Sequence, residues 1–325
     1  MKYINKLFLC LGLSLAVFLS GCNTANLFVP YQLDSNVSAF SITNHNTDVK
    51  VDSFASSLCV GNTNITANTS VNMNDATAAA LFDVNNVNII YGKNIHERLA
   101  PASITKILTA LVALEEGNLE DIITVTKGVQ INESGATLCG LKEGDTLTLN
   151  QALHALLIQS ANDAANAIAI HLGGSIEGFA AMMNEKAVEL GATNSHFVNP
   201  HGLSADDHYT TVYDLYLIFN KVIQYELFRE IIHMENYSTS YQDKSGNEKV
   251  MKFKTTNLFL RGNYDSPNKV TVIGGKTGTT NAAGNCLIIL SKDAAGNPYI
   301  SVILRSKERQ LMYEQMIDLL EEIYK

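Results

Sequence analysis

Hydrophobic and polar positions divide the chain into an N-terminal apolar run, a polar stretch and a long patterned region. Lys2 and Lys6 precede the apolar run, which extends from Leu7 to Leu19. A positively charged start before a short apolar core is typical of a secretory signal peptide, and the run is too short for a comfortable membrane span. Residues 23–53 are rich in Asn, Ser, Thr and Asp, which predicts a flexible linker before an ordered domain.

Residues 78–94 predict the first strands of the ordered region. The run AAALFDVNNVNIIYGKN places two strand-like segments around an Asn-rich turn at Asn85 and Asn86. After Pro101 the pattern changes to that of a helix. Its apolar residues recur at helical spacing, namely Ile104, Ile107, Leu108, Leu111, Val112 and Leu114.

Residues from about 115 to 235 have a mostly helical pattern. Segment 149–172 is apolar along one face, and segment 178–191 ends in a glycine, as helices often do. Segment 210–223 begins with Thr211 and Asp214 in the spacing of a capping box.

Strand patterns return after about residue 236. The segments KVMKFKTTN, TVIGGKTGTT, NCLIILSKD and YISVILRS are joined by the turn signals NAAGN and DAAGNP, which predicts an antiparallel meander. The segment LMYEQMIDLLEEIY then closes the chain as an amphipathic helix. This order of elements predicts one α+β domain over residues 54–325.

Composition and charge narrow the class of protein. The chain has 325 residues, of which 46% are apolar and 17% charged, as in ordinary globular proteins. A formal net charge of −9 without a basic run argues against nucleic-acid binding. Cys59, Cys139 and Cys286 are widely spaced and lack the spacing of a metal site. One disulfide with a free thiol and three buried thiols both fit them.

The end of the apolar run carries a second signal. The sequence LSGC that ends at Cys22 resembles the lipobox of bacterial lipoproteins. The resemblance implies removal of residues 1–21 and acylation of the Cys22 thiol, with residues 22–53 as the linker. Several acyl chains anchor a protein stably, so we expect an exported bacterial lipoprotein on a membrane that faces the cell wall or periplasm.

Ser103 and Lys106 are the first pair that could perform chemistry. Three residues of helix bring two side chains to one face, one turn apart. A serine in the first turn would lie beside unpaired N–H groups that stabilise an oxyanion. A neutral lysine could then remove the proton from its hydroxyl. The residues after Pro101 also fit an ordinary helix start, so the pair alone leaves both interpretations open.

Two further motifs follow along the chain. Ser160-Ala161-Asn162 fits either a helix junction or a second hydroxyl and an amide beside the first pair. The run GGKTGTT places glycines around Lys276 in a strand, where glycine often marks the close approach of another backbone. Such an edge strand could pair with an extended peptide, whereas an exposed lysine on an ordinary strand is the alternative.

The three motifs follow one another as S-x-x-K, S-x-N and K-T-G, which is the set of penicillin-binding proteins and serine β-lactamases. From about residue 54 to the end, the chain resembles the low-molecular-mass penicillin-binding proteins, the serine D-alanyl-D-alanine carboxypeptidases. The matching segments are ERLAPASITKILTALVALE, GLKEGDTLTLNQALHALLIQSANDAANAIA, FVNPHGL and GGKTGTTNAAGNCL. The resemblance implies a β-lactamase/DD-peptidase-like α+β fold, in which helices and an inserted, mostly helical subdomain flank an antiparallel sheet.

The resemblance also implies which residues perform the reaction. Ser103 would be the acylated nucleophile and Lys106 its general base. Ser160 would pass a proton to the leaving D-alanine, and Asn162 would bind the substrate amide. The backbone N–H groups of Ser103 and Thr279 would form the oxyanion hole.

The remaining matched residues would bind the substrate. Lys276 would sit near Ser160 and act electrostatically on the proton relay and the substrate carboxylate. Thr277 and Thr279 would hydrogen-bond that carboxylate, with Gly278 between them. Arg305 falls where some of these enzymes keep an arginine for the terminal carboxylate.

The ionisable residues within and beside these motifs can be interpreted further. If Lys106 and Lys276 share one cleft, each disfavours the charge of the other, so we expect a lowered pKa and a neutral amine at Lys106. His201 beside a glycine and Asp163 at a helix start are interpreted as structural residues.

The resemblance implies peptidoglycan stem peptides as substrates and β-lactam antibiotics as covalent inhibitors. We expect no cofactor, no metal and no nucleic acid as partner, and no additional C-terminal β-domain after the last helix.

Three alternatives stay open. A D,D-endopeptidase would cleave peptidoglycan cross-links with the same residues. A class A-like β-lactamase needs a Glu with an Asn four residues later, and Glu185 is followed at that distance by Glu189. A non-catalytic peptidoglycan-binding lipoprotein would be expected to lack some of the motif residues, all of which are present here.

Overall fold

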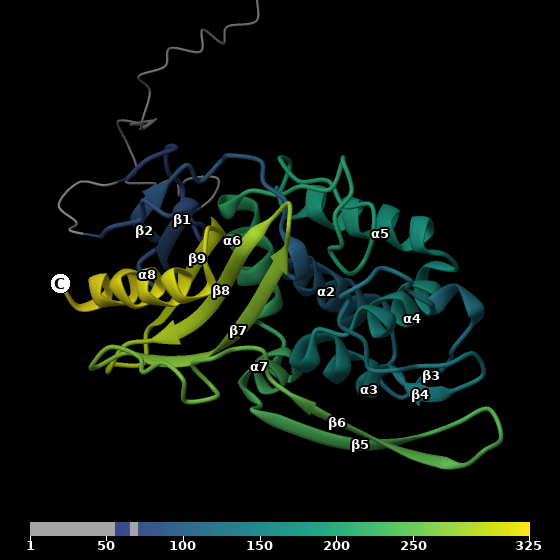
Figure 1. Ribbon diagram of the computed structural model, residues 1–325. Coiled ribbons are helices and arrows are strands. Elements are labelled where there is room, and N and C mark those ends of the chain that lie inside the picture. Colours follow the sequence, from purple (N-terminus) through teal and green to yellow (C-terminus); the bar gives the residue numbers. More distant parts are fainter. Residues whose placement is uncertain (1–55, 66–70) are drawn as a thin grey trace, which may run out of the picture. The chain divides into compact units, whose positions relative to one another are not determined.

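The computed structural model describes residues 56–65 and 71–325 (Figure 1). The predicted signal peptide, Cys22 and the linker that follows it lie outside the described residues. Among the helices of the described ranges, none is both long and apolar enough to cross a membrane.

A five-stranded antiparallel sheet with the order β2-β1-β9-β8-β7 forms the centre of the fold. Its strands are β1 (Ala76–Asp83), β2 (Asn88–Lys93), β7 (Thr271–Thr280), β8 (Gly284–Lys292) and β9 (Pro298–Ser306). The successive pairing of β7, β8 and β9 confirms the meander that the two turn signals predict. Because β9 also pairs with β1, early and late parts of the chain meet in the middle of the sheet.

Side chains alternate between the two faces of this sheet, and each face has its own core. On β1, Ala80 and Phe82 belong to the larger core, whereas Ala79 and Leu81 belong to the smaller one. Helix α8 (Arg309–Glu321) covers the face of the smaller core, as Figure 1 shows. A central strand buried on both faces is therefore apolar at nearly every position.

The larger core lies between the sheet and a group of helices in which α2 contacts α4, α5 and α6. The helices of this group are α2 (Lys106–Glu116), α3 (Leu149–His154), α4 (Asn162–Gly173), α5 (Ile176–Glu189), α6 (Val212–Val222) and α7 (Glu226–His233). Short helical turns occur at Ala102–Thr105, Lys127–Val129, Ala155–Gln159 and Glu322–Tyr324. This is the α+β fold that the order of elements predicts.

A second antiparallel sheet, of order β3-β4-β5-β6, corrects two parts of the prediction. Its strands are β3 (Ile122–Thr124), β4 (Thr146–Thr148), β5 (Asn236–Gln242) and β6 (Glu248–Lys254). The region that the sequence predicts as mostly helical also contains β3 and β4. The prediction missed them because strands of three residues are too short to show alternation. Placing segment 249–257 in the later meander is wrong, because β6 pairs with β5 and a long loop separates it from β7.

Cys59, Cys139 and Cys286 are all unpaired. Cys59 and Cys286 are buried, and Cys139 is partly buried. The Cys59 backbone N–H donates to the Tyr216 hydroxyl at 3.0 Å. The sequence allowed either one disulfide with a free thiol or three buried thiols. The structure has three free thiols, of which two are buried and one is partly buried.

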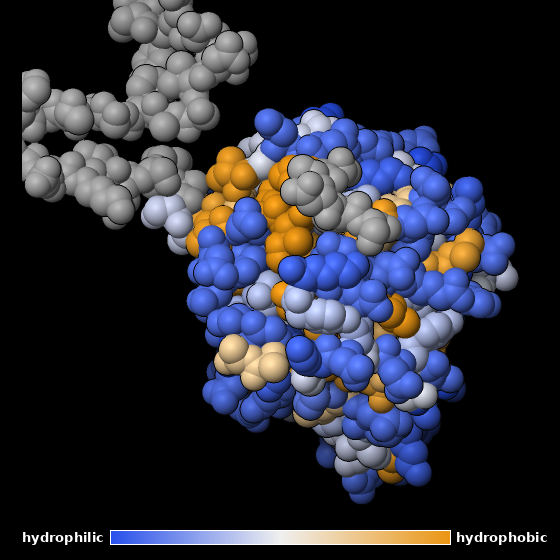
Figure 2. Space-filling model, turned by 90° about the vertical axis from the view of Figure 1, so that its left-hand side faces the viewer, coloured by the Kyte–Doolittle hydropathy of each residue, from blue (hydrophilic) through white to orange (hydrophobic). Residues whose placement is uncertain are grey.

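Figure 2 shows the side of the protein that lies to the left in Figure 1. Hydrophilic side chains cover most of this side, and apolar side chains gather near its upper left. The most exposed large hydrophobic residues in the described ranges are Val60, Ile122, Leu138, Val188, Val250 and Tyr324. They come from different elements, and single exposed apolar residues are normal on protein surfaces.

We expect Phe82→Ala to lower the free energy of unfolding by about 3–5 kcal/mol, measured by urea denaturation. Phe82 is fully buried and stacks on Tyr216, with ring centroids 4.2 Å apart and an interplanar angle of 14°. Val250→Ala, at a residue that is 63% exposed, is the control and should change it by less than about 0.5 kcal/mol. Equal losses in the two variants would contradict this packing.

Candidate active site

Ser103 lies in a tight helical turn that leads into α2. The turn Ala102–Thr105 is a 3₁₀ helix, and α2 begins only at Lys106. The sequence predicted Ser103 in the first turn of an α-helix, whereas it lies in the 3₁₀ turn before that helix. In a 3₁₀ helix, residues three apart lie directly above one another. The Nζ atom of Lys106 consequently lies 3.0 Å from Ser103 Oγ.

The amine of Lys106 is fully buried and surrounded by oxygen atoms. Its Nζ lies 2.6 Å from Asn162 Oδ1 and 2.6 Å from the carbonyl oxygen of His201, in addition to its contact with Ser103. A neutral amine has two hydrogens and one lone pair. The two carbonyl oxygens can only accept, so they take the hydrogens, and the lone pair faces the Ser103 hydroxyl.

A second lysine–serine pair lies beside the first. Lys276 Nζ, on β7, donates to Ser160 Oγ at 2.8 Å and to the carbonyl of Thr277 at 2.8 Å. Ser160 has a left-handed backbone with φ of 64°, between one helical turn and the start of α4. A non-glycine residue keeps this conformation only where its surroundings hold it. The helix junction thus turns Ser160 towards Lys276, while Asn162 faces Lys106.

Burial changes the protonation of both lysines. It lowers the pKa of Lys276 to about 7 and lowers the pKa of Lys106 well below 10.5. The charge of Lys276 lowers the pKa of Lys106 further, and the carboxylate of Asp163 opposes this. A neutral Lys106 amine can therefore act as a base towards Ser103.

The strand β7, at one edge of the central sheet, approaches the Ser103 turn very closely. A Cβ atom added to Gly278 would lie 2.9 Å from the carbonyl oxygen of Pro101 and 2.9 Å from Ser103 N. A Cβ at Gly275 would overlap the Ile288 carbonyl. These contacts confirm that the glycines mark close approaches of other backbone segments.

The threonines of β7 have different partners. Thr277 Oγ1 donates to Thr256 Oγ1 at 2.6 Å, and Thr279 Oγ1 donates to Asn285 Oδ1 at 3.3 Å. Sequence reasoning missed Thr256, because a threonine after a strand carries no signal of its own. It missed Asn285 for the same reason, although the residue lies in the matched segment NAAGNCL.

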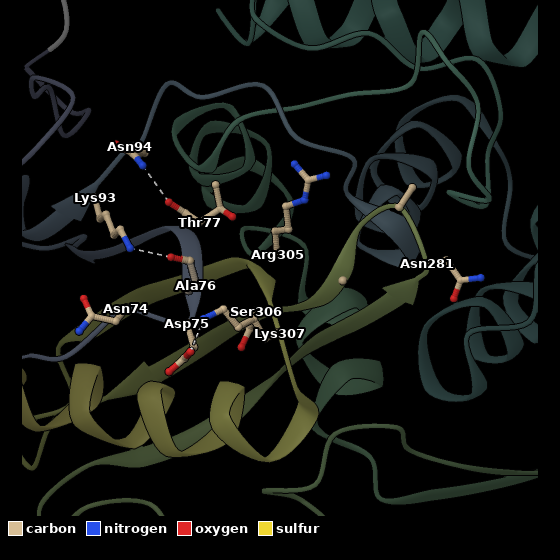
Figure 3. A pocket seen from close by; sticks show the side chains of 12 residues that line it. Asn74, Asp75, Ala76, Thr77, Lys93, Asn94, Asn281, Arg305, Ser306 and Lys307 are labelled. Atoms are coloured by element: carbon tan, nitrogen blue, oxygen red, sulfur yellow. Dashed lines mark hydrogen bonds and ion pairs between the residues drawn. The ribbon is translucent and has the colours of Figure 1, made fainter.

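Arg305 lies where the pairing of β8 and β9 shifts by a bulge, and its backbone is left-handed with φ of 56°. Bulges turn side chains in new directions and are common near active sites. Figure 3 shows the Arg305 side chain pointing away from Lys307 and Asp75, in a cavity of about 510 Å³. Asn281, in the turn after β7, lines the same cavity. The structure thus places Arg305 beside the C-terminal end of β7, next to Gly284 at the start of β8.

His201 and Asp163 have structural contacts, as interpreted from the sequence. His201 Nδ1 accepts from the N–H of Leu203 at 3.1 Å, and burial lowers the pKa of this ring to about 3. The Asp163 carboxylate accepts three successive backbone N–H groups of residues 139–141. His201 contributes to the site through its main-chain carbonyl, which accepts from Lys106 Nζ. A pattern of residue types could not indicate this main-chain contact.

Known proteins share this arrangement of elements. A family model described as D-alanyl-D-alanine carboxypeptidase matches residues 64–308. D-alanyl-D-alanine carboxypeptidase DacF of Bacillus subtilis is 32% identical over 255 residues, which are 75% of this chain and 61% of the relative. D-alanyl-D-alanine carboxypeptidase DacC of Escherichia coli is 30% identical over 255 residues, which are 76% of this chain and 60% of the relative. The chain therefore spans about three fifths of the length of these curated relatives.

A solved structure agrees with the sequence matches. The crystal structure of the Streptomyces K15 DD-transpeptidase is similar with a TM-score of 0.72 and 26% sequence identity. The similarity covers 78% of this chain and 98% of that chain.

The two lysine pKa values predict how acylation of Ser103 by a penicillin depends on pH. The rate should follow the neutral fraction of Lys106, so it should rise with pH through a pKa far below 10.5. Lys276→Met removes the neighbouring positive charge, so the pKa of Lys106 should rise and this rising limb should move to higher pH. Stopped-flow acylation rates across pH measure the shift, with the exposed Lys292→Met as control. A rising limb near 10.5 in the wild type, or one unmoved in Lys276→Met, would contradict the assignment.

Proposed function

The chain belongs to the D-alanyl-D-alanine carboxypeptidase family, and we propose that it removes the terminal D-alanine of peptidoglycan stem pentapeptides through an acyl-enzyme on Ser103. The observation that carries this proposal is the pair of buried lysine–serine contacts. Lys106 lies against Ser103 and Lys276 against Ser160, where β7 packs closely on the helical turn of Ser103. The names of the related enzymes support the same reaction.

In the first step, Ser103 Oγ attacks the carbonyl carbon between the two D-alanines while its proton passes to the Lys106 amine. The carbonyl oxygen becomes an oxyanion, and the N–H groups of Ser103 and Thr279 stabilise it. Their proximity is supported by the close approach of β7 to the turn at Gly278.

In the second step, the C–N bond breaks and the leaving amine of D-alanine takes a proton. The proton that Lys106 took from Ser103 passes through the Ser160 hydroxyl to this amine. Lys276 holds the Ser160 hydroxyl in place. The ester on Ser103 then reacts with water, which restores the serine and releases the shortened peptide.

The substrate is held along β7. Asn162 uses its Oδ1 for Lys106, which leaves its amide N–H groups for a substrate carbonyl. Thr277, Gly278 and Thr279 form the strand edge on which the extended peptide lies. Lys276 and Arg305 supply positive charge for the terminal carboxylate.

Cleavage of cross-links, a D,D-endopeptidase activity, is a second candidate function. Arg305 lines the cavity of about 510 Å³ and also a second cavity of about 430 Å³, which Ser204 and Tyr209 line as well. The space beside this residue favours a leaving group larger than D-alanine, such as a second peptide strand.

We expect fluorescent penicillin to label the wild type and Ser245→Ala, an exposed control, but not Ser103→Ala. The activity assay uses a pentapeptide muropeptide and a cross-linked dimer, with product masses as the readout. Release of D-alanine alone supports the carboxypeptidase, and conversion of dimers to monomers supports the endopeptidase. Label on Ser103→Ala would refute the nucleophile, and absence of label on the wild type would favour a non-catalytic binder.

The membrane anchor is part of the proposal. Cys22 follows the apolar run directly and resembles the acylated cysteine of bacterial lipoproteins. Acyl chains on this thiol would hold the catalytic region at a membrane surface beside its polymeric substrate, with the polar residues after Cys22 as a spacer.

Cys22→Ser should abolish incorporation of a labelled fatty acid and move the protein from the detergent phase to the aqueous phase in detergent partitioning. Cys10→Ser is the matched control, because Cys10 leaves with the predicted signal peptide and should not change either result. A fatty-acid label that persists in Cys22→Ser would refute the anchor and would leave the proposed reaction unaffected.

A further inference from the structure

Ala102, the residue before the nucleophile, has a left-handed backbone with φ of 48°. Residues other than glycine rarely adopt this conformation, and it persists only where neighbouring groups hold it. Because Ala102 and Ser103 share a peptide bond, the groups that hold Ala102 also set the direction of the Ser103 backbone.

The carbonyl of Ala102 is held by one side chain and enclosed by one glycine. Thr105 Oγ1 donates to the Ala102 carbonyl at 2.8 Å, and Thr105 is almost completely buried. Gly202, with φ of 85°, packs so closely on the same carbonyl that a Cβ atom there would overlap it. The carbonyl is therefore confined to one direction.

His208 determines which way the Thr105 hydroxyl points. Its Nε2 lies 2.8 Å from Thr105 Oγ1, and its Nδ1 accepts from the N–H of Val198 at 3.1 Å. With Nδ1 as acceptor, the neutral ring carries its hydrogen on Nε2 and donates it to Thr105. Thr105 then has only its own hydrogen left to donate, and the Ala102 carbonyl accepts it. Burial lowers the pKa of His208 to about 4, so the ring is neutral at neutral pH.

The Ala102 carbonyl and the Ser103 N–H belong to one planar trans peptide, in which the two groups point in opposite directions. Fixing the carbonyl therefore aims the N–H. Ser103 N lies against β7, since a Cβ at Gly278 would come within 2.9 Å of it. Ser103 N therefore lies on the side of the turn along which the K-T-G strand passes.

We propose that Thr105 and His208 are positioning residues for the oxyanion hole. The hydrogen-bond chain from His208 through Thr105 to the Ala102 carbonyl directs the Ser103 N–H at the developing oxyanion. Successive hydrogen bonds also polarise one another, which strengthens the donor at the end of the chain. This inference rests on the proposed acyl transfer at Ser103, and His208 acts through Thr105 without touching the substrate.

Four substitutions separate the links of this chain. Thr105→Val removes the hydroxyl but keeps the shape of the side chain, and Thr105→Ser keeps the hydroxyl. His208→Asn retains an acceptor at the position of Nδ1 but loses the donor, whereas His208→Gln retains a donor at the position of Nε2. The last two are matched amides of equal polarity, of which Asn keeps the link to Val198 and Gln keeps the link to Thr105.

The measurements are the acylation rate constant with penicillin, its non-covalent dissociation constant, and the infrared stretch of the ester carbonyl in the acyl-enzyme. Loss of a whole oxyanion donor slows such reactions about 10²- to 10³-fold, so a misdirected donor in Thr105→Val should cost about 10- to 100-fold in acylation. The dissociation constant should stay near the wild-type value. The ester carbonyl stretch should move to higher frequency in Thr105→Val and His208→Asn, because a weaker hydrogen bond polarises the carbonyl less.

Thr105→Ser and His208→Gln should recover most of the rate and the wild-type carbonyl frequency. Adding His208→Asn to Thr105→Val should cause no further loss, because both act through one chain. A lowered melting temperature with unchanged acylation rate and carbonyl frequency would make the role structural and overturn the proposal. If Thr105→Val does not fold, equal carbonyl frequencies in the two His208 variants would overturn it. A wild type that forms no acyl-enzyme would refute the proposed function itself, before any variant is compared.

Discussion

The burial of two lysine amines near one another is the constraint on which the site depends. Lys106 and Lys276 are almost completely removed from solvent, and charged amines in such a place are costly unless oxygen atoms surround them. Asn162, Ser160 and main-chain carbonyls supply these oxygens. The remaining cost appears as lowered pKa values, and a lysine with a lowered pKa is the kind of base that a serine nucleophile requires.

Close backbone contacts hold the segments of this site together. Gly278 lets β7 reach the Ser103 turn, and Gly202 lets another loop reach the Ala102 carbonyl. Side chains at these positions would push the segments apart, which explains glycine within a strand despite its entropic cost. Ala102 and Ser160 have left-handed backbones, which are strained for residues other than glycine. Ala102 precedes the proposed nucleophile, and Ser160 takes part in the proposed reaction itself.

Elements with a strong internal pattern could be predicted from the sequence, and short or paired ones could not. The helix after Pro101 and the strands around NAAGN and DAAGNP follow from apolar spacing and turn residues within each segment. β3 has three residues, and its pairing with β4 depends on a chain segment more than twenty residues away. β5, the partner of β6, is the polar run NYSTSYQ, which shows no apolar alternation and so gave no sign of a strand.

The sequence by itself determined the reacting residue types and their local spacing. Ser103 and Lys106 are one helical turn apart, and Ser160 and Asn162 lie within three consecutive residues, so each pair is close whatever the rest of the chain does. Only the tertiary structure decided that Lys276 meets Ser160, that the His201 carbonyl binds Lys106, and that Thr256 and His208 support the site. Those contacts join residues from about 20 to more than 100 positions apart, and they form only when sheet and helices pack and exclude water.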